Sequence, residues 1–490
     1  MQRKVFIQPG SPNDENRHYL PEAIKGSDMV VNENGNNSQV YPERLIEYTD
    51  AVTDGISDTW YEYVPASYDG TTKVPLVVSM HGGLMTGWGQ AIYTSWTLVA
   101  DREGFIVLFP SAGRRRFWMI DIEKEKLEEI TAPREDGMYL NRPPEDPADN
   151  HDMNFILGLI ERMVQKYNID EGRIFIQGMS MGEMMSNQMA RYHGKVFAGM
   201  AGSGAPSNPS LLFDQAGEIL NRGGPLAVWQ TRLEHDQDTF HGDMDYVVMK
   251  NLEYWKRING CGGLPELKIE GEDNFAFYRG EQADLVFRDV KNRDHGQTFD
   301  DAELVWDYLF SGIRRDEQGQ IVNREPLSPR KGDEFAIALA DGSAKAFVGN
   351  RLVTMSGPAT RHKKLKYHGL NGGAIVRGDY FMVPVSFVAE VFGASCSKSH
   401  EGFAAEVALP DGRVLQFARG SIGCVVDNRI HSMLCEAVFR DGELYVPIEW
   451  VCRRLFNHHT STCEDVLYIT DHDAELSLNM ARIIRDDILV

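Results

Sequence analysis

The sequence predicts an α/β fold, with a doubly wound, mostly parallel sheet followed by a smaller C-terminal α+β module. Short and almost wholly apolar runs at 74–80 and 105–110 are typical of strands that are buried on both faces. Stretches with apolar residues at helical spacing, such as 153–167, alternate with these runs, as they do in parallel sheets. Beyond residue 330 short strands and turns dominate, which indicates a second architecture.

The remaining elements of the first region follow in the same alternation. A charged, proline-containing stretch at 114–152 interrupts it, and we expect an insertion or loop there. The further strands are expected at 60–64, 173–177, 197–204, 225–229 and 285–290, and the helices at 96–102, 184–192, 246–258 and 300–313.

Changes in composition divide the chain into five segments. Within the last third, residues 381–392 resemble residues 444–456, and each copy is predicted to be a strand that ends at a proline and leads into an amphipathic helix. The predicted segments are an N-terminal arm at 1–45, an α/β domain at 46–315, a charged linker at 316–332, an α+β module at 333–475 and a C-terminal tail at 476–490.

The composition excludes several classes of function. The net charge of the 490 residues is −22, so the surface repels a phosphate backbone and we expect no nucleic-acid partner. No apolar run is long enough to span a membrane, and no signal peptide is recognisable. The six cysteines form no C-x-x-C pair, so we expect reduced cysteines and a cytoplasmic protein.

Ser180 is the strongest candidate for a catalytic residue. It is the centre of Gly178-Met179-Ser180-Met181-Gly182, between a predicted buried strand and a predicted helix, which is the context of a nucleophile elbow. The tight turn lifts the serine above the sheet, and the two glycines permit its crowded backbone. The motif therefore predicts a doubly wound sheet of the α/β-hydrolase kind, with Ser180 as the nucleophile.

A serine nucleophile needs a base and donors for the developing oxyanion. His81-Gly82-Gly83 ends the strand at 74–80, where hydrolases of this kind supply an oxyanion amide. We expect the amides of Gly83 and Met181 to form the oxyanion hole, with Leu84 as the alternative to Gly83. The chain order of serine, acid and histidine makes His295, which follows the strand at 285–290, the expected base.

Three carboxylates compete for the role of the triad acid in the loop after the strand at 225–229. Asp236 is the first choice, Asp238 the second and Glu234 the third. The same loop contains histidines and would also suit a metal ion, but solvated acidic loops are far commoner. We therefore expect no metal and no cofactor.

The insertion at 114–152 is expected to contribute to a substrate pocket. It starts with a basic run at 114–116, which would attract an acidic substrate or, more commonly for such runs, form a solvated loop. Phe117, Trp118 and Tyr139 would line an acyl or aryl pocket, or pack locally. The remaining candidates for substrate contacts are Leu84 and Glu183.

Several segments around these residues occur together in one known family. They are 63–65, 75–82, 100–110, 152–156, 167–170, 173–182 and 255–261. Through them, residues 58–312 resemble the polyhydroxybutyrate-depolymerase-like esterases, a group that includes feruloyl and acetylxylan esterases. The resemblance implies an α/β-hydrolase fold and ester hydrolysis, and the separation of Ser180 from His295 suits the family.

Two positions depart from the family pattern. The family usually has a second glycine after Gly-x-Ser-x-Gly, and Glu183 stands in its place, where a carboxylate would alter the pocket or the behaviour of the base. The family also usually carries a glycine three residues before the triad acid. Leu233 occupies that position if Asp236 is the acid, so the register favours Asp236.

The C-terminal region, at about 333–472, resembles the copper-amine-oxidase N-terminal-like module through its Val383-Pro384 and Val446-Pro447 repeats. Despite that name, the resemblance implies no copper, and such modules are usually accessory. We expect the module either to cover the site or to form a homo-oligomer.

These observations together predict a serine carboxylesterase that hydrolyses small or phenolic esters, of the feruloyl or acetyl type, through an acyl-enzyme. The alternatives are a polyester (hydroxyalkanoate) depolymerase or a serine peptidase of the same fold, and a non-catalytic binding protein. The intact Ser180 and His295 favour an active enzyme whose partner is a small ester.

Overall fold

The computed structural model describes residues 42–113, 115–135, 137–236, 242–368 and 372–490. The predicted arm at 1–45 therefore lies outside the described residues up to residue 41. The chain divides into two compact units, the first reaching to Gly263 and including Phe277–Arg330, the second made of Leu264–Ala276 and Lys331–Val490. The chain thus passes from one unit to the other at three points, one of them at residue 330, inside the predicted linker at 316–332.

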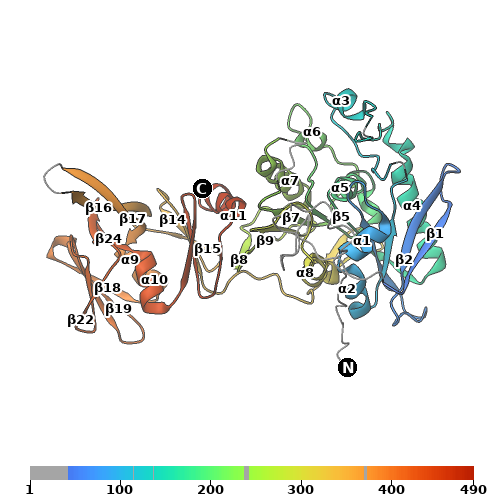
Figure 1. The fold of residues 1–490 in the computed structure, drawn as a ribbon. Coiled ribbons are helices and arrows are strands. Elements are labelled where there is room, and N and C mark those ends of the chain that lie inside the picture. Colours follow the sequence, from blue (N-terminus) through green and yellow to red (C-terminus); the bar gives the residue numbers. More distant parts are fainter. Residues whose placement is uncertain (1–41, 114, 136, 237–241, 369–371) are drawn as a thin grey trace, which may run out of the picture. The chain divides into compact units, whose positions relative to one another are not determined.

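The described residues of the chain form a ten-stranded sheet in the order β1-β2-β4-β3-β5-β6-β7-β10-β9-β8 (Figure 1). Neighbouring strands pair in parallel along the series β4-β3-β5-β6-β7-β10, as the apolar runs predicted. At one edge, β1 and β2 pair antiparallel. Their bounds are Leu45–Ala51, Ser57–Tyr63, Val74–Met80, Ile106–Pro110, Ile169–Met179, Gly199–Ser203, Ala227–Leu233, Glu266–Glu270, Asp273–Tyr278 and Leu285–Val290 for β1 to β10. The predicted α/β-hydrolase fold class is confirmed.

Helices pack around this sheet (Figure 1), and α5 lies against β5 and β6. The helix predicted at 300–313 ends at Tyr308, because the chain turns at Leu309 into a short 3-10 segment and then into β11. The helices are α1 (Gly87–Tyr93), α2 (Trp96–Glu103), α3 (Leu127–Thr131), α4 (His151–Lys166), α5 (Met181–His193), α6 (Pro209–Leu212), α7 (Met244–Asn259) and α8 (Asp301–Tyr308).

The segment between α8 and the second unit contains a small hairpin, in which β11 (Ile313–Arg315) pairs with β12 (Ile321–Asn323). The described residues of the second unit from Lys331 onward form three antiparallel sheets, in the orders β15-β14-β13-β26-β25, β16-β17-β24-β23 and β18 to β22. Their bounds are Ala336–Ala340, Lys345–Val348, Arg351–Thr354, Thr360–His368, Gly373–Pro384, Ser395–Ser399, Ala404–Ala408, Val414–Ala418, Gly423–Val426, Arg429–Ser432, Val438–Arg440, Glu443–Pro447, His459–Cys463 and Val466–Thr470 for β13 to β26.

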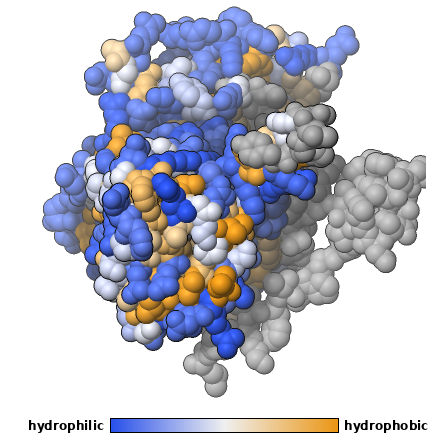
Figure 2. Space-filling model, turned by 90° about the vertical axis from the view of Figure 1, so that its left-hand side faces the viewer, coloured by the Kyte–Doolittle hydropathy of each residue, from blue (hydrophilic) through white to orange (hydrophobic). Residues whose placement is uncertain are grey.

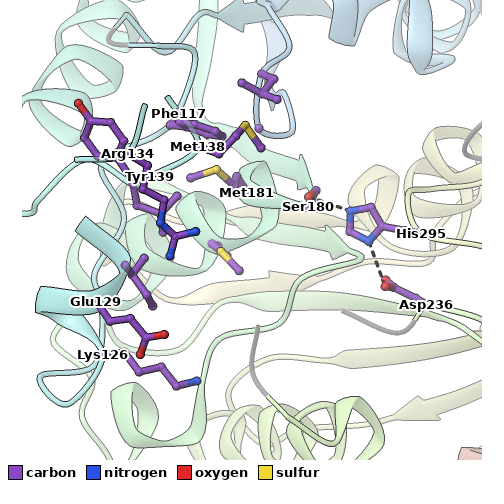
Figure 3. Close-up of a pocket in the computed structure, with 15 residues that line it drawn as sticks. Phe117, Lys126, Glu129, Arg134, Met138, Tyr139, Ser180, Met181, Asp236 and His295 are labelled. Atoms are coloured by element: carbon purple, nitrogen blue, oxygen red, sulfur yellow. Dashed lines mark hydrogen bonds and ion pairs between the residues drawn. The ribbon is translucent and has the colours of Figure 1, made fainter. Parts of the chain in front are cut away.

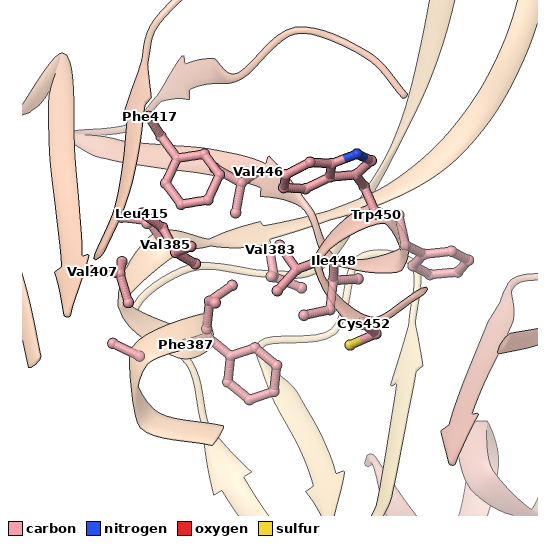
Figure 4. Close-up of a cluster of buried hydrophobic side chains, with 14 of the residues drawn as sticks. Val383, Val385, Phe387, Val407, Leu415, Phe417, Val446, Ile448, Trp450 and Cys452 are labelled. Atoms are coloured by element: carbon pink, nitrogen blue, oxygen red, sulfur yellow. The ribbon is translucent and has the colours of Figure 1, made fainter. Parts of the chain in front are cut away.

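The internal repeat forms the centre of the second unit. As predicted, each copy is a strand that ends at a proline and continues directly into a helix, β17 into α9 (Val385–Val391) and β24 into α10 (Ile448–Phe456). The two strands pair antiparallel, with Val383 opposite Val446. Figure 4 shows that the two copies bring their apolar side chains into one core, which includes Trp450. Each copy thereby buries a face that it could not bury alone.

The predicted tail at 476–490 folds onto the second unit. It contains α11 (Leu478–Arg482) and a π-helical turn at Ile483–Ile488, whose isoleucines are buried. The structure describes all six cysteines, and none is in a disulfide. None of the helices in the described residues has the length and apolar character that a membrane crossing requires.

Figure 2 shows one face of the molecule, on which hydrophobic residues gather among hydrophilic ones. The second unit exposes large apolar side chains that include Leu365, Val376, Ile422 and Ile430, the last of them 81% exposed. Single exposed apolar side chains are ordinary, so these residues alone do not identify a partner surface. The expected roles of the module in covering the site or in oligomer formation stay predictions.

Candidate active site

Ser180 stands on a strained turn between β5 and α5. Its backbone has φ 55° and ψ −126°, outside the regions that a residue with a side chain normally adopts. Such strain costs roughly 1–3 kcal/mol and persists only where the surroundings enforce it. Here the amide of Ser180 donates to the carbonyl of Ser203 at the end of β6, at 2.8 Å. The turn presents the hydroxyl at the carboxyl end of the parallel strands.

The two glycines of the motif are required by close backbone approach. A Cβ at Gly178 would lie 2.0 Å from the carbonyl oxygen of Gly182, and a Cβ at Gly182 would lie 2.2 Å from that of Met80. These distances are far below van der Waals contact, so neither position admits a side chain without movement of the backbone.

Ser180, His295 and Asp236 form a continuous hydrogen-bonded chain (Figure 3). Nε2 of His295 lies 2.8 Å from Oγ of Ser180, and Nδ1 lies 3.0 Å from Oδ1 of Asp236. The Asp236 side chain is only 2% exposed, whereas that of His295 is 39% exposed. A buried carboxylate therefore orients an imidazole whose other nitrogen reaches a solvent-accessible hydroxyl, which is the arrangement that activates serine.

The other candidates in the acidic loop lie elsewhere. Glu234 accepts a hydrogen bond from the amide of Asn292 at 2.8 Å, which ties the acid loop to the loop of His295. Asp238 lies outside the described residues. Asp243, which comes after these candidates, caps α7 by accepting hydrogen bonds from the amides of its first turn. Among the described residues, no three His, Cys, Asp or Glu side chains are grouped as ligands for a metal ion.

The turn at 82–84 faces the elbow. A Cβ at Gly83 would lie 3.1 Å from Sδ of Met181, so the two turns are in contact. The amide of Leu84 donates to the carbonyl of Arg116 at 2.9 Å and is therefore occupied. In the described part of the chain, no hydrogen bond uses the amide of Gly83 or of Met181, and both residues line the cavity beside Ser180.

His81 holds this turn in place. Its Nδ1 donates to the carbonyl of Gly82 at 2.6 Å, and its Nε2 accepts from the amide of Ala112 at 2.9 Å. This pattern needs a neutral ring, and burial lowers the pKa of His81 to about 4. His81 is thus a structural residue, fully buried, that fixes the backbone next to Gly83.

A cavity of about 800 Å³ opens beside Ser180. Figure 3 shows the triad on one side of it and side chains of the insertion on the other. The wall nearest the serine is apolar, and charged side chains follow farther along the insertion. The lining residues from the insertion are Phe117, Lys126, Glu129, Ile130, Arg134, Met138, Tyr139 and Leu140.

Two predicted pocket residues do not reach this cavity, which corrects the prediction from sequence. Trp118 is fully buried, and its Nε1 donates to the carbonyl of His81 at 2.8 Å. Glu183 is 2% exposed and points toward the end of β6. The basic run at 114–116 also makes contacts within the insertion through Arg115. Arg115 donates a hydrogen bond to the carbonyl of Tyr139 and stacks on the ring of Tyr139, so Arg115 stabilises the insertion.

Sequence patterns did not reveal the polar residues that hold the base. Nε2 of Gln177, on β5, donates to Oε1 of Gln297 at 2.9 Å, and both side chains are buried. The hydroxyl of Ser203 donates to the carbonyl of Gly296 at 2.6 Å. These bonds tie the loop of His295 to the two strands beside the elbow. Only a glutamine inside an otherwise apolar strand pattern could have indicated them.

Comparisons with known proteins agree with the family resemblance. The chain is similar to feruloyl esterase B of Piromyces equi, with 27% identity over 263 residues, which cover 50% of this chain and 43% of that protein. It is also similar to probable acetylxylan esterase A of Neosartorya fischeri, with 30% identity over 182 residues, which cover 36% of this chain and 41% of that protein. The matches thus span about two fifths of each relative's length.

Among solved structures, an acetyl xylan esterase from Aspergillus awamori aligns with 18% identity and a TM-score of 0.37, over 54% of this chain and 98% of that one. Residues 366–458 match the model of the copper amine oxidase N-terminal domain. The two resemblances predicted from sequence, to feruloyl and acetylxylan esterases and to this N-terminal domain, are therefore confirmed.

Proposed function

We propose that this chain is a serine carboxylesterase that hydrolyses small or phenolic esters, of the feruloyl or acetyl type, through an acyl-enzyme. The observation that carries the proposal is the chain of hydrogen bonds from Ser180 through His295 to the buried Asp236, at the edge of a cavity of about 800 Å³. The similarity to feruloyl and acetylxylan esterases supports the same class of substrate.

The first half of the reaction forms the acyl-enzyme. Nε2 of His295 takes the hydroxyl proton as Oγ of Ser180 attacks the ester carbonyl carbon. Asp236 stabilises the imidazolium that results. The imidazolium then gives its proton to the leaving alcohol, and the ester C–O bond breaks. In the second half, water attacks the acyl group by the same route and releases the acid.

The oxyanion of each tetrahedral intermediate needs donors that are in place beforehand. The amides of Gly83 and Met181 suit this role, because both lie next to Ser180 and neither is used by another hydrogen bond of the described chain. Met181 also begins α5, where the helix dipole favours negative charge. Each donor is expected to contribute about 10²–10³ in rate.

The cavity suits an acyl group with an apolar or aromatic body. Phe117, Ile130 and Met184 lie on its walls, and the volume is large enough for a phenolic acid. A substrate that fits there places its carbonyl next to Ser180, so that the acyl group, and not only the alcohol, determines specificity.

The test is a panel of esters, assayed with the wild type and with Ser180→Ala. The panel comprises p-nitrophenyl acetate, methyl ferulate, p-nitrophenyl 3-hydroxybutyrate and a peptide p-nitroanilide. The proposal expects turnover of the acetyl or feruloyl ester that Ser180→Ala abolishes. Preference for the hydroxybutyrate ester or the anilide would favour the depolymerase or peptidase alternative. Equal rates for wild type and Ser180→Ala would contradict serine hydrolysis altogether.

A further inference from the structure

Glu183 is a buried carboxyl group beside the nucleophile that the proposed mechanism does not use. It is the third residue of α5, three residues after Ser180, and it is 2% exposed. The described structure shows no ion pair with it, and the charged groups that act on it are Asp236, after β7, and Asp301, at the start of α8. Burial raises the pKa of Glu183 to about 8, so the group is uncharged near neutral pH.

The side chain of Glu183 lies against the end of β6. A Cβ at Gly202 would lie 2.5 Å from Cγ of Glu183, so the glutamate fills the space that this glycine leaves open. One carboxyl oxygen, Oε2, accepts a hydrogen bond from the amide of Ala205 at 2.5 Å. Glu183 therefore holds the turn at 203–205 by packing on one side of it and by bonding its far end.

This turn touches every member of the triad. The carbonyl of Ser203 accepts from the amide of Ser180 at 2.8 Å, and its hydroxyl donates to the loop of His295. A Cβ at Gly204 would lie 3.3 Å from Cε1 of His295 and 3.5 Å from Oδ2 of Asp236. A shift of the turn would therefore move the imidazole and the carboxylate relative to Ser180.

We propose that Glu183 is a positioning residue that fixes the Asp236–His295 pair through the turn at 203–205. The inference rests on the proposed function of the triad. An uncharged carboxyl suits the place, because it accepts the amide hydrogen bond of Ala205 without repelling the nearby carboxylate of Asp236. This role explains why a glutamate stands directly after the elbow.

The test compares Glu183→Gln with Glu183→Met in the full chain. The two replacements have similar length and no charge, but only glutamine has an oxygen that can accept the hydrogen bond from Ala205, since the sulfur of methionine is a weak acceptor. With p-nitrophenyl acetate, we expect Glu183→Gln to keep most of the wild-type kcat. Glu183→Met should lose roughly tenfold in kcat with little change in KM, since a displacement well below 1 Å is enough for such a loss.

The pH profile separates positioning from a merely structural role. In Glu183→Met the acid limb of kcat/KM should move to lower pH, because a displaced Asp236 stabilises the imidazolium less. A loss of folded protein would lower the rate at every pH without moving that limb. Glu449→Met is the matched control, because Glu449 in the first turn of α10 accepts from the amide of Phe381 at 2.8 Å, in the second unit. We expect it to leave kcat and the acid limb unchanged.

The outcomes are distinguishable. Equal kcat and equal acid limbs for Glu183→Met and Glu183→Gln overturn this inference and leave the proposed function standing. Equal losses in the two variants also overturn it, because the hydrogen bond would then not matter. A wild type without turnover that depends on Ser180 overturns the proposed function, and this inference with it. If Glu183→Met does not fold, Glu183→Ala is judged by the same criteria.

Discussion

Among the described residues, the direct turn from β5 into α5 differs in backbone strain from the two turns that lead into the helices of the repeat. In the first unit β5 runs into α5 through Ser180, with φ at 55°. In the second unit β17 and β24 run into their helices through Pro384 and Pro447, with φ at −54° and −71°, which are relaxed values for proline. The helix after the strained turn and the helix after Pro447 each have a buried glutamate in their first turn, Glu183 and Glu449, whose carboxyl group accepts a hydrogen bond from a backbone amide.

The strained and the relaxed turns differ in the side chains that they place. The relaxed turns lead into a core of apolar side chains. The strained turn exposes one hydroxyl, next to a histidine and a buried carboxylate. The strained turn therefore carries the candidate nucleophile, whereas the repeat uses the same connection between strand and helix to pack an apolar core.

The largest expected effect is on the triad acid. Asp236→Asn should lower kcat by about 10³–10⁴-fold, because an amide cannot hold the imidazole in the required tautomer or stabilise its charge. Steady-state kinetics with p-nitrophenyl acetate measure the effect. Glu234→Gln is the control and should change kcat by less than about threefold, since Glu234 bonds the amide of Asn292 and not His295. A larger loss of kcat for Glu234→Gln than for Asp236→Asn would identify Glu234, and not Asp236, as the triad acid.

The next largest effect is expected on stability when a side chain is added at a glycine of the nucleophile elbow. Gly178→Ala should lower the free energy of unfolding by on the order of 3 kcal/mol or more, because its Cβ would meet the carbonyl of Gly182 at 2.0 Å. Chemical denaturation followed by tryptophan fluorescence gives the value. A loss below about 1 kcal/mol would show that the turn has room to relax, and the contrast with the proline turns would then disappear.

The stability of the first unit should depend on pH through Glu183. Its pKa of about 8 in the folded chain lies above the ordinary value of 4.5, so the folded state holds a proton that the unfolded state releases. The free energy of unfolding should therefore fall as the pH rises from about 4.5 to 8, by about 4 kcal/mol, relative to Glu183→Gln. Denaturation of both proteins at pH 5, 6.5 and 8 measures this. A difference that stays constant with pH would mean that Glu183 is ionised in the folded state.

The smallest effect is expected in the repeat. Pro447→Ala should lower stability by about 1 kcal/mol or less, because it acts mainly through the entropy of the unfolded chain. The kcat for p-nitrophenyl acetate should not change, since the turn carries no catalytic group. Thermal unfolding and the ester assay give both quantities. A loss of kcat without unfolding would show that the second unit contributes to the reaction.

The local pattern of apolar residues was sufficient to predict an element where burial is uniform along that element. The strands β3 and β4 and the elbow were predictable, because a strand covered on both faces reads as an unbroken apolar run. The strand β8 was missed although its residues alternate between charged and apolar, because the run has only five residues, two of them apolar, at the edge of the sheet. Its place depends on Asp333, 64 residues away, which accepts from the amide of Ile269.

The site was predictable at its centre and less so around it. Chain order and motif predicted Ser180 and His295, and the register favoured Asp236 over Asp238 and Glu234, but only the structure shows that Asp236 bonds His295. The occupied amide of Leu84 could not be inferred, because its partner is the carbonyl of Arg116 in the insertion. The buried place of Trp118 likewise depends on a contact with His81, which no spacing encodes.

The most direct test of the account is to map a covalent adduct of a fluorophosphonate on the full chain by peptide mass spectrometry. We expect a single adduct on the peptide that contains Ser180, absent in Ser180→Ala and formed much more slowly in Asp236→Asn. An adduct on another residue, or equal labelling of wild type and Ser180→Ala, would contradict the claim that the strained turn between β5 and α5 presents the nucleophile.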